Sequence, residues 1–359
     1  MAIYSRISNG VNVTKAIAGV FLSLISLSVM FFVLQGAWSL SKNQNLFLGN
    51  ILGGFNVIEP VLTNESLKPL VPHRNWDVQD LVLESESAIT VESSFSNSDK
   101  ILFQKNSYAK LPIASLTKLM TAVISVENYS PNDVILVSKN AVHQDGVQGS
   151  LELGEGMKAG DLLYIMLIES SNQAAYVLSE GLSDVPLSLT AKSDANSSIN
   201  YDSGEGVEAE VEEFKIEVEY NQKFVSLMNK KAQELGMENT FFAEPTGLSP
   251  KNISTADDLI KLAKYILKDH REIAQISKTK EYNLPDYGLL TNTDQLLGEI
   301  EGIVGGKTGF TIEAKGCLIL ILKSFEKDNY LVYVILGADD KFSEMKKMID
   351  WVNSAYQWK

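Results

Sequence analysis

Three short groups of residues supply a hydroxyl, two amines and an amide. They are Ser115-Leu116-Thr117-Lys118, Ser170-Ser171-Asn172 and Lys307-Thr308-Gly309, which read S-x-x-K, S-x-N and K-T-G. A serine hydroxyl attacks a carbonyl carbon only when a base removes its proton. Residues three apart share a helix face, so Lys118 is placed to serve Ser115 as that base, provided that burial lowers the pKa of its amine.

The other two groups complete a site for acyl transfer. Ser170 is placed to relay a proton to a leaving amine. The Asn172 amide both donates and accepts, so it can orient a lysine and hold a peptide carbonyl. Lys307-Thr308-Gly309 suits a strand at the edge of a sheet, where an extended peptide adds through main-chain bonds and its carboxylate meets the ammonium and hydroxyl groups.

Each group by itself is a weak signal. S-x-x-K also occurs at Ser39–Lys42 and Ser324–Lys327, and S-x-N at Ser41–Asn43 and Ser198–Asn200, whereas K-T-G occurs once. Taken alone, Ser115 and Lys118 would be read as a helix N-cap and a solvated lysine, and K-T-G as a polar turn. The order of all three patterns, in suitable surroundings, favours the chemical interpretation.

Hydrophobic periodicity predicts the elements that carry these groups. Helices are expected from near Ser115, whose apolar stripe includes Leu119 and Val123, and over Asp161–Ile168, Phe224–Leu235, Thr255–Leu267 and Ser343–Trp358. Strands are expected at Ala88–Val91 and Ile101–Phe103, with a buried hairpin over Gly316–Leu322 and Tyr330–Leu336. Strands at both ends with helices between them predict an α/β protein of the α+β type, with one antiparallel sheet built from both chain ends and a helical lobe.

Composition narrows the class of protein. The net charge of −14 argues against nucleic acid as a partner. The single Cys317 lies in an apolar run, which predicts a buried thiol and no internal disulfide. His73, His143 and His270 are scattered without metal-ligand spacing, so we assign no metal and expect no cofactor.

The N-terminal segment is expected to attach the protein to the cell membrane. Residues 16–40 are uncharged, largely apolar and about long enough to span a bilayer once, and Arg6 and Lys15 precede them. The positive-inside tendency makes residues 1–15 cytoplasmic and the catalytic part extracytoplasmic. The alternative is a signal peptide cleaved near Ala37-Trp38-Ser39, which would give a secreted protein.

Two further segments are distinguished by composition. Residues 41–80 mix an apolar patch with prolines and are expected to form a stalk, which leaves 81–359 as the globular domain. Residues 184–220 carry ten acidic side chains against two lysines, which predicts an insertion that is disordered in its first half. Its second half, 207–220, is compatible with a hairpin or a helix, and deletion of the insertion is expected to leave activity intact.

The chain resembles the D-alanyl-D-alanine carboxypeptidases, the low-molecular-mass penicillin-binding proteins of the S11 serine peptidase family. The likeness runs from about Ile101 to Trp358. Besides the three motifs it includes the blocks Phe103–Met120, Ser150–Leu163, Leu235–Thr240, Pro245–Leu248 and Ser254–Ala256. The resemblance implies a β-lactamase/transpeptidase-like fold.

The resemblance also implies a role for each site residue. Ser115 would be the acyl-forming nucleophile, Lys118 its base, and Ser170 with Asn172 the relay and positioning pair. The terminal carboxylate would bind at Lys307, Thr308 and Gly309, and the backbone N–H groups of Ser115 and Phe310 would form the oxyanion hole. The substrate would be the D-Ala-D-Ala end of a peptidoglycan stem peptide, and β-lactams would inhibit by acylating the same serine.

The chain departs from the family pattern at three places. Gln173 replaces an acid, Asp294 replaces the second asparagine of an Asn-Thr-Asn block, and Lys341 lies among acidic residues where members often carry arginine. Two alternative functions stay open: a D,D-endopeptidase with the same machinery, and a penicillin-recognising sensor with little turnover. A class A β-lactamase is disfavoured, because no E-x-x-L-N element lies between S-x-N and K-T-G.

Overall fold

The structure, a computed structural model, describes residues 70–96, 98–146, 151–182 and 222–359. The expected membrane span, most of the expected stalk and the acidic segment 184–220 lie outside these described residues. Among the described residues, no helix combines the length and the apolar character needed to cross a membrane.

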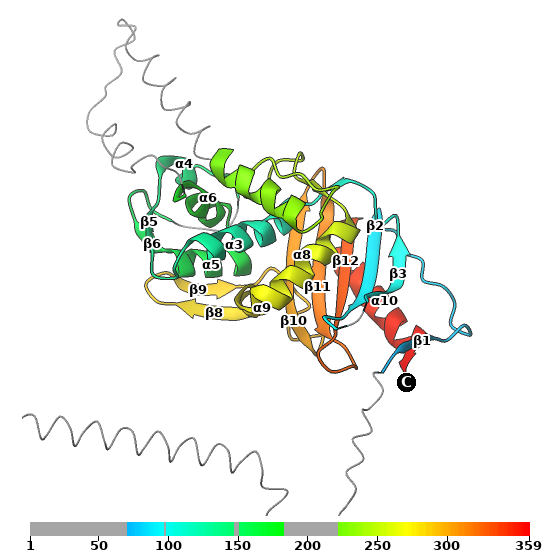
Figure 1. Ribbon diagram of the computed structural model, residues 1–359. Coiled ribbons are helices and arrows are strands. Elements are labelled where there is room, and N and C mark those ends of the chain that lie inside the picture. The colour runs from blue at the N-terminus through cyan, green and yellow to red at the C-terminus, as the bar shows by residue number, and fades with distance from the viewer. Residues whose placement is uncertain (1–69, 97, 147–150, 183–221) are drawn as a thin grey trace, which may run out of the picture. The chain divides into compact units, whose positions relative to one another are not determined.

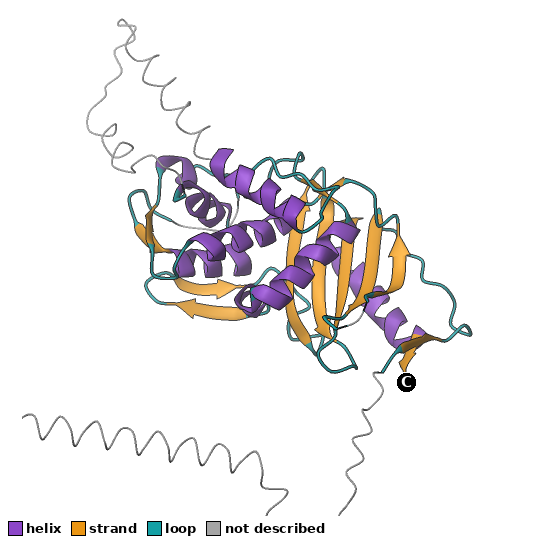
Figure 2. Ribbon diagram, in the orientation of Figure 1, coloured by secondary structure: helices purple, strands orange, loops and turns teal. Residues whose placement is uncertain are grey.

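A five-stranded antiparallel sheet organises the domain (Figure 2). Its order is β10–β11–β12–β2–β3, so strands from both ends of the chain lie side by side, as predicted. The bounds are Ser87–Ser93 for β2, Lys100–Lys105 for β3, Ile303–Thr311 for β10, Lys315–Lys323 for β11 and Tyr330–Ala338 for β12. The predicted hairpin is β11–β12, and β10, which carries K-T-G, is an edge strand of this sheet.

Both faces of the sheet are covered, which explains the almost unbroken apolar runs of β11 and β12. Side chains alternate along a strand, so Ile319 and Ile321 join one hydrophobic core while Leu318 and Leu320 join the other. Helices α8 (Ala256–Asp269) and α9 (Arg271–Ser277) pack on one face, and α10 (Lys341–Ala355) packs on the other (Figure 1).

The helical lobe lies beside the β10 edge (Figure 1). It consists of the 3-10 turn η1 (Ala114–Leu116), α3 (Thr117–Asn128), α4 (Lys139–Val142), α5 (Ala159–Ile168), α6 (Asn172–Glu180) and a helix over 222–234. α5 is buried on most sides, as its uniformly apolar sequence predicted. Two-stranded pairs complete the fold: β4 (Leu111–Pro112) with β7 (Ile253–Ser254), β5 (Val134–Leu136) with β6 (Gly156–Lys158), and β8 (Glu281–Leu284) with β9 (Gly288–Thr291).

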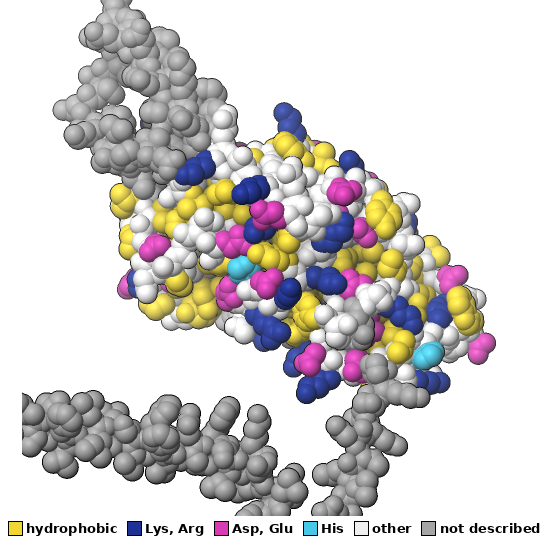
Figure 3. All heavy atoms as spheres, viewed as in Figure 1, with side chains coloured by type: hydrophobic (Ala, Val, Ile, Leu, Met, Phe, Trp, Pro, Cys, Tyr) yellow, Lys and Arg dark blue, Asp and Glu magenta, His cyan; other side chains and the backbone are white. Residues whose placement is uncertain are grey.

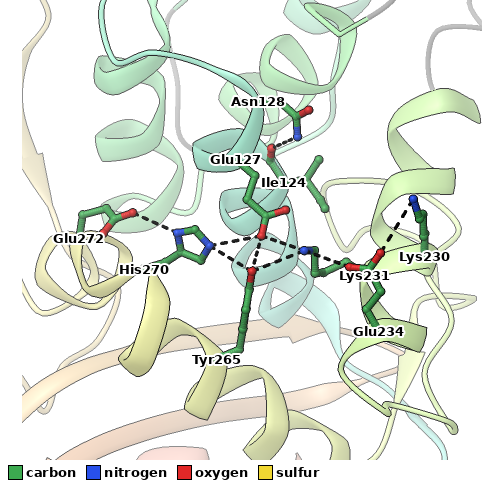
Figure 4. A network of polar contacts seen from close by, with 9 residues as sticks. All are labelled: Ile124, Glu127, Asn128, Lys230, Lys231, Glu234, Tyr265, His270 and Glu272. Atoms are coloured by element: carbon green, nitrogen blue, oxygen red, sulfur yellow. Dashed lines mark hydrogen bonds and ion pairs between the residues drawn. The ribbon is translucent and has the colours of Figure 1, made fainter.

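A polar network joins the last turn of α3 to its neighbours (Figure 4). The Glu127 carboxylate accepts a 2.5 Å hydrogen bond from the Tyr265 hydroxyl of α8 and pairs at 2.9 Å with Lys231 of the helix over 222–234. The His270 ring, just after α8, lies 3.3 Å from the same carboxylate. Burial acts to raise the pKa of Glu127, but the bonds from Tyr265 and Lys231 outweigh it and lower that pKa. The network holds one end of the helix whose other end carries Lys118.

One face of the domain carries mixed charges. On the face seen in Figure 3, acidic and basic side chains are interspersed with hydrophobic ones rather than gathered by sign. The described residues of that face therefore create no single-sign field of the kind that steers a highly charged partner.

The structure corrects the predicted last helix and shows a strand ahead of the predicted start of the domain. Helix α10 ends at Ala355, and the last residues form β13 (Tyr356–Trp358), which pairs with β1 (Pro72–Arg74). The Tyr356 hydroxyl donates to the Leu102 carbonyl at 2.7 Å, which holds this pair against the sheet. The domain thus begins before Leu81, in the segment predicted as stalk, and the compact unit starts at Pro69. Apolar periodicity is local, so it cannot reveal a strand partner at the opposite end of the chain.

Removal of the α10 N-cap is predicted to destabilise the domain. The Asp340 carboxylate accepts hydrogen bonds from the backbone N–H groups of Phe342 and Ser343 at 3.1 and 3.0 Å. Asp340→Ala is therefore expected to lower the free energy of unfolding by about 1 kcal/mol in urea denaturation. Asp339→Ala is the matched control, because that side chain is 87% exposed and pairs with the exposed Lys315. Equal losses in both variants would contradict the capping role.

Candidate active site

The start of α3 places Lys118 beside Ser115. Ser115 lies in η1, and α3 proper begins at Thr117, two residues later than the predicted start. Lys118 Nζ lies 3.0 Å from Ser115 Oγ, and the Lys118 residue is 0% exposed. The reading as a solvated lysine is therefore wrong. The N-cap position of α3 is Leu116, so Ser115 is not an N-cap either.

Three oxygens surround the Lys118 amine. Besides Ser115 Oγ they are Asn172 Oδ1 at 2.7 Å and the Thr246 backbone carbonyl at 2.5 Å. The Asn172 amide is oriented by its other end, because Nδ2 donates to the Asp145 carbonyl at 2.5 Å. A neutral amine has two N–H groups and one lone pair. Asn172 Oδ1 and the Thr246 carbonyl can only accept, so they take the two N–H groups, and the lone pair falls to Ser115, whose hydroxyl can donate.

The surroundings of Lys118 favour this neutral form. Burial lowers the pKa of the Lys118 amine to about 7, while the negative charge of Glu244 acts in the opposite direction. Near neutral pH a large share of the molecules therefore carry a free base against the Ser115 hydroxyl. The geometry places Lys118 where the sequence predicts the base to lie, and its role as a base stays a prediction.

The second amine lies across from the first. Lys307 on β10 is 2% exposed, and its Nζ donates to Ser170 Oγ at 2.8 Å and to the Thr308 carbonyl at 3.0 Å. Ser170 adopts φ = 65° between α5 and α6, while the next residue, Ser171, caps α6 through a 3.2 Å bond from Ala174 N. Burial, and then the charge of Lys118, lower the pKa of Lys307 well below its ordinary value.

Strand β10 passes directly over the serine, so K-T-G is not a turn. A Cβ at Gly309 would lie 3.0 Å from both the Ser115 nitrogen and the Ala114 Cβ. Glycine at this position therefore permits the close approach of strand and 3-10 turn. Thr308 Oγ1 is 2.6 Å from Thr293 Oγ1, and the Phe310 side chain is 65% exposed at the outer end of the strand.

The three departures from the family pattern have distinct structural positions. The Gln173 amide donates to the Val142 carbonyl at 2.9 Å and accepts from Leu151 N at 3.3 Å. Asp294 is 5% exposed, and its charge raises the pKa of Lys307, whereas burial lowers that pKa. Lys341 Nζ lies 5.9 Å from the Phe310 ring centre, and burial lowers the pKa of this amine.

Of the other motif copies named above, the structure describes one. Ser324–Lys327 lies in the turn between β11 and β12, where Ser324 donates to Glu92. Ser39–Lys42, Ser41–Asn43 and Ser198–Asn200 lie outside the described residues. Across those residues no group of three His, Cys, Asp or Glu side chains is arranged to hold a metal ion.

Sequence reasoning missed several contributors to the site. Some act through backbone atoms, and one, Thr293, acts through its contact with the Thr308 hydroxyl. The carbonyls of Thr246 and Asp145 and the hydroxyl of Thr293 have no residue-type signature. The family-like blocks around Pro245–Leu248 and Asn292–Asp294 were the available signal, since both contain such contributors.

A serine hydroxyl against a fully buried, neutralisable lysine, with a second buried lysine on the adjacent strand edge, defines a serine acyl-transfer site. The family model of the S11 peptidases, D-alanyl-D-alanine carboxypeptidase, matches residues 75–184 and 219–340. The chain belongs to this family. The resemblance inferred from its motifs is thereby confirmed.

Individual relatives agree with this assignment. D-alanyl-D-alanine carboxypeptidase DacF of Bacillus subtilis is 32% identical over 292 residues, which cover 77% of this chain and 64% of DacF. A D-alanyl-D-alanine endopeptidase of Pseudomonas aeruginosa is 30% identical over 282 residues, which cover 76% of this chain and 78% of that protein. The chain thus spans a little less than two thirds of DacF.

Solved structures show the same fold. The D-alanyl-D-alanine carboxypeptidase of Mycobacterium tuberculosis H37Rv superposes with a TM-score of 0.62 at 20% identity, covering 79% of this chain and 96% of that one. A mutant of the Streptomyces K15 DD-transpeptidase superposes with a TM-score of 0.61 at 21% identity, covering 77% of this chain and all of that one. The predicted mixed fold with an antiparallel sheet, similar to transpeptidases, is confirmed.

Gly247 is predicted to be intolerant of any side chain. It has φ = 92°, and an added Cβ would lie 2.1 Å from the Ala114 carbonyl oxygen, so Gly247→Ala must displace η1 or the loop. We expect a loss of about 3 kcal/mol or more in the free energy of unfolding, measured in urea. Gly236→Ala is the control, because Gly236 also has positive φ (69°) but its added Cβ meets nothing within 4 Å. That variant should lose about 1 kcal/mol, and an equal loss at both positions would refute the packing argument.

Proposed function

We propose that this protein is a serine D-Ala-D-Ala carboxypeptidase that forms an acyl-enzyme on Ser115. The hydrogen bonding of Lys118 is the observation that carries this proposal. Two acceptor-only oxygens take its N–H groups, which leaves the lone pair for the Ser115 hydroxyl. Family membership and relatives named D-alanyl-D-alanine carboxypeptidases supply the substrate class.

Acylation uses the two lysines in turn. Lys118 accepts the Ser115 proton while Oγ attacks the carbonyl carbon of the penultimate D-Ala. The backbone N–H groups of Ser115 and Phe310 stabilise the oxyanion, since β10 lies against η1 at this point. Ser170, held by Lys307, delivers its hydroxyl proton to the leaving nitrogen and receives in exchange the proton that Lys118 took from Ser115. The C–N bond breaks, D-Ala departs as the free amino acid, and Lys118 is again a neutral base. Water activated by Lys118 then hydrolyses the ester and restores Ser115.

Strand β10 binds the end of the substrate. An extended peptide adds along this edge, and its terminal carboxylate meets the Thr308 hydroxyl and the Lys307 amine. A bound carboxylate favours the protonated form of Lys307, which offsets the effect of burial on its pKa. Lys341, near Phe310, adds a further cation at the outer end of the strand.

The proposed setting of the reaction rests on the sequence. The substrate is the D-Ala-D-Ala end of a peptidoglycan stem peptide, and β-lactams are inhibitors that acylate Ser115. The domain works on the outer side of the cell membrane, with residues 16–40 as a single-pass anchor. Cleavage of that segment as a signal peptide would instead give a secreted enzyme.

A D,D-endopeptidase is the second candidate. This candidate is supported by relatives named D-alanyl-D-alanine endopeptidase in Pseudomonas aeruginosa and Escherichia coli. The alignment with this chain covers 78% of each of them, compared with 64% of DacF. The sensor hypothesis was motivated by the departures near Asn172 and by the acidic insertion. Gln173 hydrogen-bonds to Leu151 N and Val142 O, and the insertion lies outside the described residues. The contact between Lys118 and Ser115 supports turnover over idle binding.

Ser115→Ala is predicted to abolish turnover, because no other hydroxyl is proposed as the nucleophile. Release of D-Ala from a stem peptide ending in D-Ala-D-Ala, followed by mass spectrometry, should fall by at least about a thousandfold. Ser324→Ala is the control, since it removes the serine of another S-x-x-K pattern and should retain activity. Wild-type activity in Ser115→Ala would overturn the assignment. Cleavage confined to cross-linked peptides by the wild type would favour the endopeptidase instead.

The rate of acylation is predicted to depend on the protonation of Lys118. Its pKa of about 7 means that the base is free above this pH and charged below it, so kcat/KM should fall about tenfold per pH unit on the acid side. Lys118→Arg is the comparison, because a guanidinium stays protonated and should remove activity at every pH tested. An acid limb far from 7, near 4 for example, would assign the titration to a carboxyl group instead.

A further inference from the structure

One carboxylate organises the loop that reaches Lys118. Oε2 of Glu244 accepts from the backbone N–H and the hydroxyl of Thr246, both at 2.6 Å. Oε1 accepts from Gly247 N at 2.7 Å, Ser249 N at 3.2 Å and Asn252 Nδ2 at 2.7 Å. In these five contacts both oxygens are acceptors, an arrangement that suits the ionised carboxylate.

The loop is fastened to the first turns of α3 at three points. The Thr246 carbonyl meets Lys118 Nζ at 2.5 Å, and the Pro245 carbonyl accepts from Thr121 Oγ1 at 2.6 Å. Asn252 Nδ2 also donates to Thr117 Oγ1 at 3.1 Å. Glu244 therefore holds, through backbone N–H groups of its own loop, one of the two acceptors that fix the direction of the Lys118 lone pair.

The charges around Lys118 give Glu244 a second effect. It faces the amine from the loop, while Lys307 faces it from β10. Asp145 contributes its backbone carbonyl through Asn172, and Asp294 and Lys341 act on Lys307. Among the described residues, Glu244 is thus the carboxylate that favours the protonated form of Lys118. Its charge raises the pKa of the amine, whereas burial lowers it.

We propose that Glu244 is a positioning residue for the Lys118 base: through its hydrogen bonds to the loop it holds the Thr246 carbonyl against the Lys118 amine and places a negative charge behind that carbonyl. This role rests on the proposed function of Lys118 as the base. A buried amine without a counter-charge binds protons more weakly and is a poorer general base.

Direct titration of the amine tests this role without depending on catalysis. Protein labelled with 13C-lysine is titrated by NMR, and the Cε signal of Lys118 is assigned as the one missing in Lys118→Arg. In Glu244→Gln the midpoint should move to lower pH by about one unit. In Glu244→Asp, which keeps the charge, it should stay close to the wild-type midpoint. Glu238→Gln, an exposed acid in the same region, is the control for net charge and should leave the midpoint unchanged.

The direction of the change separates the proposed role from a structural one. If Glu244 only keeps the loop folded, its loss admits water to Lys118, and the midpoint moves to higher pH or does not move. If the folded Glu244→Gln variant gives either result, the proposed effect of the Glu244 charge on Lys118 is overturned. If Glu244→Gln does not fold, Glu244→Asp decides: an unchanged midpoint with acylation slowed about tenfold supports the role, and an unchanged rate or a shifted midpoint overturns it.

The titration also distinguishes this role from the proposed function. A wild-type protein that shows the expected Lys118 midpoint and the Glu244→Gln shift, but releases no D-Ala, would refute the carboxypeptidase and leave the Glu244 effect standing. If the wild type releases D-Ala but the Lys118 midpoint is unchanged in Glu244→Gln, the carboxypeptidase function stands and the Glu244 effect is refuted.

Discussion

An amine with no exposed surface is the feature on which the rest of this structure depends. A fall in pKa from 10.5 to about 7 for Lys118 corresponds to a bias of about 5 kcal/mol toward the neutral form relative to water. The structure accommodates this amine by giving it three oxygens and by placing a carboxylate beyond one of them. In the proposed mechanism the same environment makes the lysine a base, so the burial that is unfavourable for stability is what would activate Ser115.

The fold brings three distant parts of the chain together at this site. The α5–α6 connection supplies Ser170 and Asn172, the loop after the helix over 222–234 supplies the Thr246 carbonyl, and β10 supplies Lys307. Glycines at 247 and 309 allow the loop and the strand to approach η1 from different directions, because a Cβ at either place would press on its backbone. The network around Glu127 fastens the C-terminal end of α3 to its neighbours. This restrains the helix whose first turn carries Lys118.

Much of this arrangement was predictable from the sequence, since side-chain type and spacing carried it. The edge position of Lys307, the pairing of Ser115 with Lys118, the β11–β12 hairpin and the sheet built from both chain ends all follow from patterns along the chain. Backbone contributors were not predictable, because the carbonyls of Thr246 and Asp145 look the same for any residue type. The β1–β13 pair was missed because strand partners far apart in sequence leave no local signal. The role of Glu244 was missed because a single acid in a loop ordinarily faces solvent.

The direction of the Lys118 lone pair is the central claim, and neutron diffraction tests it most directly. In a crystal held above pH 8, hydrogen positions should show two hydrogens on Lys118 Nζ, directed at Asn172 Oδ1 and the Thr246 carbonyl. The Ser115 hydroxyl hydrogen should then point at the nitrogen. Three hydrogens on Nζ, or a Ser115 hydroxyl turned away from it, would contradict the account.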